Sequence, residues 1–417
     1  MPESNSYQVK YSVSLIGSLK SHLKGLLGYE TMILELMQNA DDAKAKEMVF
    51  DIRDKSLRVT NSAEFKYCGD LNKECTIDNK CDFHRIFEFA SGLKENNSEN
   101  IGKFGIGFAS TYQITDCPKI ISHGISAEFH PEIGSIDIEE IQTNRTTFDL
   151  PWAKDNESKL RIALGLGNIN DENINKLYSD CEEVLNESLL FLRHLSRVEL
   201  KRNGQSSLIV SLNRKRSEGN HELSISFEPE KRSTEQWIVF KKECSNEKVS
   251  QLIKEFPLLA VDKKKRDIQI ALKIDSIPIR RGLIYAYLPT KQSSFMPLHI
   301  NADFYPDPSR KSINLSGEQH QQKWNELLIE GAAEIIAIEL ETMTKHISHK
   351  DLFELLLTSY KAHNNKDFPF TSFWSCIENS IKDGAKVFYN SKGLYEALDN
   401  MAYDKNLNQR KDDELSI

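Results

Sequence analysis

Apolar residues recur at helical spacing in the first part of the chain and alternate with polar residues, as in strands, further on. From Leu15 to Lys46 the pattern predicts two helices around a turn that contains Gly25 and Gly28. The same patterns predict further short elements before residue 200, with strands at 48–52, 57–60, 119–122, 127–130 and 145–150, and helices at 84–90 and about 174–195.

After Val198 the sequence changes to strand-like runs separated by charged turns, namely VELKR, SLIVSL, LSISFE, WIVFKK, IQIALKI and GLIYAYLP. The run WNELLIEGAAEIIAIELETM and the ranges 350–360 and 371–381 are helical by period. We therefore expect an α+β chain with an α/β domain at 1–200, a second mixed α/β domain at 201–345, and a helical C-terminal segment with a charged tail at 346–417.

Composition narrows the class of protein. The 417 residues carry 62 acidic and 54 basic side chains, a formal charge of −8, so we expect no general attraction to nucleic acid. No apolar run approaches the length of a membrane span, and the first residues lack a secretory signal. A cytoplasmic protein with its seven cysteines reduced is expected. The basic run 263–266 fits a solvated loop better than a binding site.

The helix around TMILELMQNADDAKAKEM carries the first candidate site. Glu35, Asn39 and Asp42 are spaced by four and three residues, so they share one side of the helix. Mg²⁺ takes oxygen ligands and keeps several waters, so the Asn39 amide oxygen suffices as its protein ligand. Glu35 then orients or deprotonates a water. The alternative is a solvated polar face of an amphipathic helix, which this segment alone favours.

A glycine-rich run, Gly102-Lys-Phe-Gly105-Ile-Gly107-Phe108, precedes an expected helix in FASTYQI. Glycines allow backbone N–H groups to approach an anion, and a helix N-terminus adds partial positive charge. The run therefore outlines a phosphate cradle, although it matches neither the P-loop nor the Rossmann spacing. An ordinary tight turn before a helix is the alternative.

Taken together, ELMQNADDA and GKFGIGFAS resemble the GHKL ATPase superfamily, which includes heat-shock protein 90, gyrase-type topoisomerases and mismatch-repair ATPases. The segments LELMQNADDAKAKEMVF, IGKFGIGFASTYQITD and PLHINADFYPDPSRKSI are similar to the sacsin-type branch, so the resemblance spans most of residues 15–315. It implies a Bergerat-type α/β sandwich that binds ATP beneath a lid, followed by a transducer-like domain.

The resemblance also assigns roles to residues. It implies that Glu35 activates water, that Asn39 binds Mg²⁺ and that Asp42 is a supporting pocket aspartate. The range 91–100 is the implied lid, in which Lys94 contacts phosphate. The implied phosphate-binding turn consists of Gly102, Lys103, Phe104, Gly105, Ile106, Gly107 and Phe108, and Lys103 supplies its positive charge.

Two positions depart from the family pattern at the implied base site. Asn61 stands where the family has an aspartate that accepts a hydrogen bond from the adenine amino group. An amide oxygen also accepts such a bond but is neutral. The family's Gly-Thr turn is Arg145-Thr146 here, so Thr146 fits and the glycine is missing. Adenine preference is therefore less secure than phosphate binding.

In related two-domain ATPases a basic residue of the second domain reaches the γ-phosphate. The loop SRKSI resembles that element, which makes Arg310 the candidate and Lys311 the second choice. A fixed positive charge there neutralises charge that develops in the transition state. An arginine in a solvated loop is the alternative.

Cys68, Cys75, Cys81 and His84 have the number and type of ligands that zinc requires. Their spacing lacks the paired C-x2-C knuckles of common zinc sites, so unrelated reduced thiols are the favoured interpretation.

The function expected from these residues is that of a slow, Mg²⁺-dependent ATPase of the sacsin and heat-shock-protein-90 type, whose conformational change remodels or switches a protein client or partner. The alternative is a regulatory or defence-related module that senses the nucleotide without hydrolysing it and signals to a partner or an effector domain. A homodimer is possible because related ATPases dimerise. The sequence also leaves open that the chain is a piece of a longer protein.

Overall fold

A computed structural model of the chain describes the residue ranges 15–77, 80–91, 107–143, 145–217, 220–229, 233–262, 264–274, 279, 281–307, 309–366 and 369–401. The chain divides into two compact units. Unit 1 comprises residues 1–187, 193–210 and 228–230, and unit 2 comprises 188–192, 211–227 and 231–417. Both units mix helices and strands, which confirms the expected α and β composition of the chain.

The strands of unit 1 lie in the order β7-β1-β2-β6-β3-β4-β5. Their bounds are β1 (Glu47–Ile52), β2 (Ser56–Asn61), β3 (Lys119–Ser122), β4 (Ile125–His130), β5 (Ser135–Glu140), β6 (Thr146–Pro151) and β7 (Arg197–Arg202). Only β1 and β7 pair in parallel among the registers given for these strands. In β2 and β6 burial alternates along the strand, so one face of this sheet is covered.

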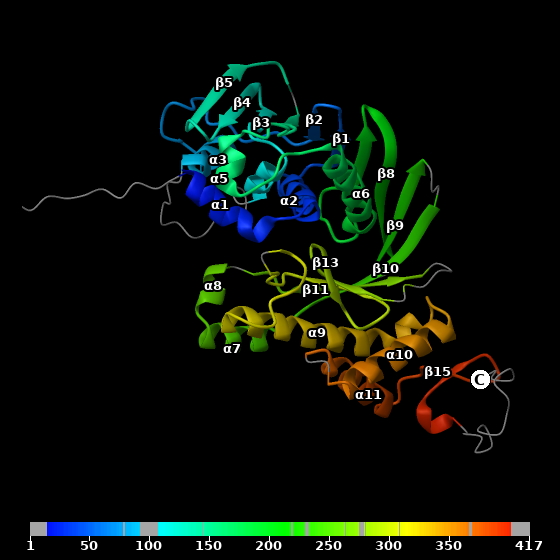
Figure 1. Cartoon of the computed structure of the whole chain (residues 1–417). Coiled ribbons are helices and arrows are strands. Elements are labelled where there is room, and N and C mark those ends of the chain that lie inside the picture. The colour runs from blue at the N-terminus through cyan, green and yellow to red at the C-terminus, as the bar shows by residue number, and fades with distance from the viewer. Residues whose placement is uncertain are drawn as a thin grey trace, which may run out of the picture. The chain divides into compact units, whose positions relative to one another are not determined.

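The helices of unit 1 lie on one side of these strands (Figure 1). They are α1 (Leu15–Leu26), α2 (Tyr29–Asp42), α3 (Asp82–Ser91), α5 (Lys159–Leu164), α6 (Asp171–Ser188) and the 3₁₀ helix η1 (Ser110–Gln113). The buried face of β1 and β2 carries Phe50, Leu57 and Val59, each at most 1% exposed. The opposite face is polar, and there Arg58 pairs with Asp149 across β2 and β6 at 2.6 Å.

The strands of unit 2 lie in the order β13-β12-β14-β11-β10-β9-β8. Their bounds are β8 (Gln205–Ser217), β9 (Asn220–Pro229), β10 (Ser233–Glu243), β11 (Asp267–Lys273), β12 (Leu283–Ala286), β13 (Leu288–Ser293) and β14 (His299–Ala302). β8 and β9 contribute residues to both units. The expected single strand GLIYAYLP forms both β12 and β13, because Tyr287 between them has a φ of 64° that reverses the chain.

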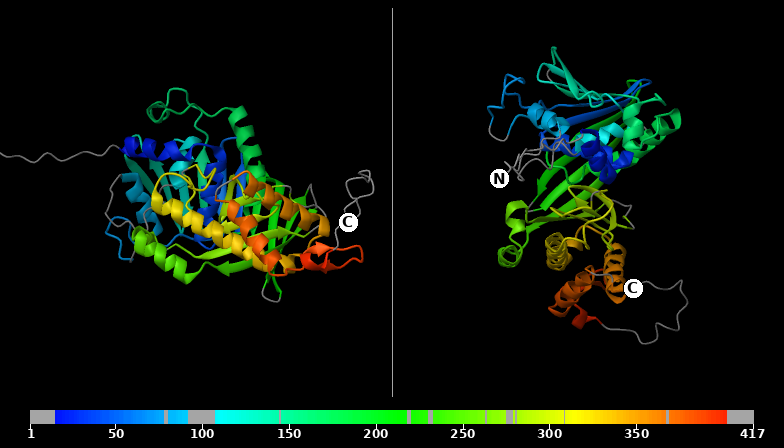
Figure 2. Two further views of the ribbon diagram at one scale, coloured as in Figure 1. Left: turned by 90° about the horizontal axis from the view of Figure 1, so that it is seen from below. Right: turned by 60° about the vertical axis from the view of Figure 1, so that its left-hand side comes forward.

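Helices cover one side of the unit 2 strands in two successive layers (Figures 1 and 2). The helices of this unit are α7 (Asn246–Glu255), α8 (Leu258–Asp262), α9 (Gln319–Met343), α10 (His349–Asn364) and α11 (Thr371–Lys382). The short pair β15 (Phe388–Tyr389) and β16 (Tyr395–Glu396) comes next along the chain, and the 3₁₀ helix η2 (Leu398–Asn400) follows it. Gly331 lets α9 lie close to β11, since a Cβ there would be 2.5 Å from Ile268 Cδ1.

The C-terminal helices are part of unit 2 and do not form a unit of their own. Leu352, Phe373 and Ile377 share a buried core with Trp324 and Ile268, which explains why the expected boundary near 345 does not separate two bodies. No helix in the described part of the chain is long and apolar enough to cross a membrane.

Candidate functional site

Helix α2 carries the first group of predicted site residues. Met32, Ile33 and Met37 are fully buried and hold one face of the helix in the core. The helix follows Gly28, whose φ of 122° suits glycine. The side chain of Gln113 pins this start, because its Oε1 accepts from Gly28 N at 2.7 Å and its Nε2 donates to Leu26 O at 2.8 Å. Gln113 was not singled out from the sequence.

Gly107 packs directly against Glu35 and Asn39. A Cβ at position 107 would lie 2.5 Å from Glu35 Oε2 and 3.3 Å from Asn39 Nδ2. Real Cβ atoms do not approach other heavy atoms to 2.5 Å, so only glycine fits without moving Glu35. Asn39 is buried and Glu35 is half-buried. The structure therefore brings together the two motifs that the sequence presented separately.

Phe108 anchors the segment after Gly107 in the core of unit 1. Its side chain is 3% exposed, and its ring centroid lies 6.1 Å from Tyr112 and 5.3 Å from Phe129. The Ser110 hydroxyl donates to Gly107 O at 2.5 Å, which closes the first turn of the helical segment. Burial raises the pKa of Tyr112, so its phenol stays neutral.

The rest of the implied phosphate turn and lid lies outside the described residues. This applies to Lys94, Gly102, Lys103, Phe104, Gly105 and Ile106. In the implied lid, range 91–100, only Ser91 is described, as the last residue of α3.

Asn61 and Thr146 face each other across β2 and β6. Directly opposed residues of an antiparallel pair project to the same face, and both side chains are buried. Asn61 Oδ1 accepts from Ala63 N at 3.0 Å. The Thr146 hydroxyl lies 2.7 Å from the hydroxyl of Ser122, which accepts from Phe65 N. The two residues implied at the base site are therefore neighbours, supported by Ser122.

The two aspartates that end α2 have different surroundings. Asp42 is mostly at the surface, where its Oδ1 accepts from Arg193 Nη2 at 2.9 Å. Asp41 is 3% exposed and accepts from three consecutive backbone N–H groups, those of Arg193 at 3.3 Å, His194 at 2.7 Å and Leu195 at 2.9 Å. Asp41 therefore fastens the end of α2, a role that the sequence did not reveal.

Arg310 lies in unit 2, in a loop organised around Asp307. Arg310 has a φ of 55°, and its N–H donates to Asp307 O at 3.0 Å. The Asp307 carboxylate accepts from the hydroxyls of Ser309 at 2.7 Å and Ser312 at 2.6 Å. Burial opposes ionisation, but these bonds and two backbone N–H bonds lower the pKa of Asp307. Both Arg310 and the more exposed Lys311 are thus held in a defined loop.

An apolar cavity of about 80 Å³ lies beside Phe108, lined also by Leu19, Phe87, Tyr112 and Phe129. Ligand pockets usually occupy about 300–1,000 Å³ and contain several polar groups. This cavity is therefore too small and too apolar to hold a nucleotide, and it is separate from the polar group around Glu35 and Asn39.

Comparison with known proteins places a recognised domain over part of unit 1. Residues 12–136 match the Sacsin domain family. Human sacsin is 37% identical over 116 residues, which is 26% of this chain and 2% of sacsin. The Arabidopsis thaliana protein NO VEIN is 34% identical over 104 residues, 25% of this chain and 4% of that protein. The chain thus spans a small fraction of the curated relatives that it matches.

Among solved structures, a crystal structure of the N-terminal domain of a DNA repair protein aligns with a TM-score of 0.39 at 12% identity, covering 76% of this chain and 97% of that chain. The sacsin-type likeness inferred from the motifs is confirmed for residues 12–136. This Sacsin-domain segment contains Glu35, Asn39, Asn61 and Gly107.

Proposed function

We propose that unit 1 is a Bergerat-type domain that binds ATP with Mg²⁺ and hydrolyses it slowly. The observation that carries the proposal is the contact of Gly107 with Glu35 and Asn39. A backbone without a side chain, a carboxylate and a buried amide meet at one place, and these groups suit a phosphate oxygen, an attacking water and a magnesium ion respectively.

Asn39 fits a magnesium site because a hard cation takes oxygen ligands, and one protein oxygen suffices when phosphates and waters supply the others. When bound there, Mg²⁺ neutralises charge on the phosphate oxygens. Asp42 supports the magnesium site indirectly, because its ion pair with Arg193 lies at the end of α2, the helix that carries Asn39.

Glu35 orients a water molecule and accepts its proton as the water oxygen forms a bond to the γ-phosphorus. The bond between the γ-phosphorus and the bridging oxygen breaks, and ADP and phosphate leave. The bare backbone at Gly107 leaves the Glu35 carboxylate in place for this step. Asn61 and Thr146 provide the polar end of the pocket, where the Asn61 oxygen accepts from the adenine amino group.

The biological outcome that we propose is conformational, in keeping with the Sacsin-domain likeness of residues 12–136. Nucleotide turnover changes the state of the chain and so remodels or switches a protein partner. Arg310 and Lys311 enter this proposal through the family resemblance alone, as the basic residues that stabilise the transferred phosphate.

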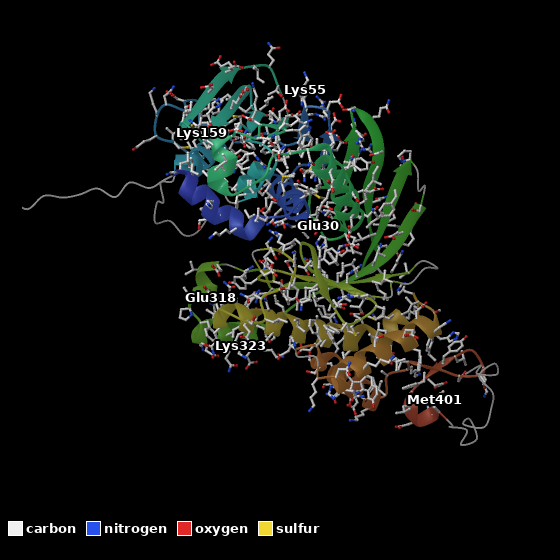
Figure 3. The ribbon with its side chains drawn as sticks, in the orientation of Figure 1. Glu30, Lys55, Lys159, Glu318, Lys323 and Met401 are labelled. Atoms are coloured by element: carbon white, nitrogen blue, oxygen red, sulfur yellow. The ribbon has the colours of Figure 1, made fainter. Side chains whose placement is uncertain are left out.

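The experiment is steady-state phosphate release from MgATP by the full chain and by Glu35→Ala. We expect the variant to bind ATP but to release phosphate at the background rate. Glu30→Ala is the matched control, because Glu30 is at the first turn of α2 (Figure 3) and faces a different side of the helix. If the wild-type protein binds ATP but releases no phosphate, the result would exclude an ATPase and favour the alternative function of a nucleotide sensor. Equal rates for wild type and Glu35→Ala would remove Glu35 from the mechanism.

A further inference from the structure

Three cysteines in the loop after β2 and a histidine in the first turn of α3 gather their ligand atoms in unit 1. The sulfurs of Cys68, Cys75 and Cys81 and a ring nitrogen of His84 all lie within 4.8 Å of one another. The sequence favoured unrelated thiols because the spacing lacks the paired C-x2-C knuckles of common zinc sites. The intervening loop has left-handed backbone at Gly69 and Lys80, with φ values of 95° and 57°. The fold of this loop brings the widely spaced cysteines together.

The separations match those around a tetrahedral zinc ion. Cys81 Sγ lies 3.7 Å from Cys68 Sγ, and His84 Nδ1 lies 3.1 Å from Cys81 Sγ and 3.4 Å from Cys68 Sγ. Zinc bonds of about 2.3 Å to sulfur and about 2.0 Å to nitrogen at tetrahedral angles place sulfurs about 3.8 Å apart and sulfur and nitrogen about 3.5 Å apart. Shifts of a few tenths of an ångström therefore suffice for Cys68, Cys81 and His84 to surround an ion, and the Cys75 sulfur, within 4.8 Å of the other three ligand atoms, is near enough to complete the set.

The second nitrogen of His84 fixes which tautomer is present. His84 Nε2 lies 2.9 Å from the carbonyl oxygen of Lys73, and a carbonyl only accepts, so Nε2 carries the proton. The lone pair of a neutral ring is then on Nδ1, which faces the sulfurs. Metal-bound histidines commonly donate their other N–H to a backbone carbonyl in this way, and the bond orients the ring.

A backbone amide also supports a thiolate in the cluster. The N–H of Cys81 donates to Cys75 Sγ at 3.0 Å. Donation from an amide stabilises negative charge on sulfur, which is the form that binds a metal. The cluster is sheltered as well, since Cys81 is fully buried and the other three residues are half-buried.

We propose that Cys68, Cys75, Cys81 and His84 bind one Zn²⁺ ion in a structural site. Three soft thiolates and an imidazole select zinc over magnesium or calcium. Four protein ligands complete the tetrahedron and leave no position for a substrate, which distinguishes a structural from a catalytic zinc site. The ion ties the loop that follows Asn61 to the first turn of α3, independently of any nucleotide chemistry.

The first test is the metal content of the full chain, purified without chelator and measured by inductively coupled plasma mass spectrometry. We expect about one zinc ion per chain in the wild type and a loss of most of it in Cys68→Ser and His84→Gln. Cys376→Ser is the matched control, since Cys376 is a half-buried cysteine of unit 2 and should leave the zinc content unchanged. Background zinc in the wild type, or equal zinc in Cys68→Ser and Cys376→Ser, would overturn the proposal.

The second test uses wild-type protein, so it does not depend on a variant that folds. After zinc is removed by a chelator under reducing conditions, Co²⁺ is added and the absorption spectrum is recorded. We expect the intense visible bands of tetrahedral cobalt together with a sulfur-to-cobalt charge-transfer band. A spectrum of octahedral cobalt only, or a Cys68–Cys81 disulfide in the protein as purified, would contradict the site.

Discussion

Gly107 is a residue of the proposed pocket at which the structure leaves no room for a side chain. Its absent side chain leaves room for Glu35 Oε2, which a Cβ would approach to 2.5 Å. The Glu35 Cβ would also be only 3.3 Å away, so the base of that side chain would be in tight contact while its flexible end would clash. Any larger residue at 107 must therefore turn Glu35 away from its present position.

We expect Gly107→Ala to lower the rate of phosphate release by at least about tenfold, because a displaced general base forfeits much of its contribution of about 10²–10⁴-fold. Phosphate release and thermal unfolding are measured on the same preparation. Gly167→Ala is the control, since Gly167 has open space around its Cβ position and an ordinary φ. Equal rates for the two variants would show that the Gly107 contact does not matter for turnover.

Asn61→Asp should sharpen the preference for ATP over GTP. A carboxylate accepts the hydrogen bond of the adenine amino group more strongly than an amide, and it can keep the bond from Ala63 N. The measurement is the dissociation constant for each nucleotide by calorimetry. We expect the ratio of the two constants to move toward ATP by a few-fold, and an unchanged ratio would place the base elsewhere.

At the residue scale, the sequence predicted on which side of an element a site residue lies, but not which distant residues it contacts. The spacing of Glu35 and Asn39 by four residues put them on one side of a helix, which the structure bears out. The contact with Gly107 depends on tertiary packing and has no local signal. The pairing of Asn61 with Thr146 depends on strand register, and the choice between Asp41 and Asp42 as the buried aspartate depends on the segment at 193–195.

At the element scale, α2 is fixed at both ends by side chains that contact distant backbone. Gln113 of η1 holds the turn that precedes α2, and Asp41 in the last turn of α2 holds the segment that leads into β7. The helix is therefore a rigid support for Glu35 and Asn39, which suits a site that needs fixed geometry.

Asp41→Ala should destabilise unit 1 far more than Asp42→Ala. Removal of the buried carboxylate leaves three backbone N–H groups without their acceptor, which we expect to cost about 3 kcal/mol in the free energy of unfolding. The exposed Asp42–Arg193 pair should contribute less than about 1 kcal/mol. Urea denaturation of both variants provides the comparison, and similar losses would contradict the assigned roles.

Periodicity predicted most of the helices and central strands, because their apolar positions face a core. It missed β5, whose sequence SIDIEE is acidic and largely exposed at the end of the strand order. It also merged β12 and β13, since the reversal at Tyr287 carries no glycine or asparagine and Pro289 lies after it, within β13. Turn-forming residues need not appear in the sequence where tertiary packing imposes the turn.

At the scale of the whole molecule, each unit has its own core, and unit 2 contains a buried histidine. His299 accepts from Leu283 N at 2.9 Å, and its ring centroid lies 5.2 Å from that of Trp237. Burial, assisted by nearby Lys273, lowers the pKa of His299 from 6.5 to about 3. The ring is neutral in the folded protein and protonated more readily in the unfolded chain.

Unit 2 should therefore lose stability as the pH falls from about 6.5 toward 3. In that interval the unfolded state binds more protons, so the free energy of unfolding falls by up to about 1.4 kcal/mol per pH unit. Urea unfolding near neutral and near pH 5 measures the slope. His299→Gln should flatten it and the exposed-site control His349→Gln should not, whereas equal slopes would assign the acid sensitivity to other groups.

The central claim, that the residues around Glu35, Asn39 and Gly107 form a nucleotide pocket, is tested most directly by thermal unfolding of the full chain with increasing MgATP. A ligand that binds only the folded state raises the unfolding temperature in proportion to the logarithm of its concentration above the dissociation constant. We predict such a rise for the wild type and for Gly167→Ala, and its loss in Asn39→Ala. An unfolding temperature of the folded wild type that does not respond to MgATP would contradict the claim.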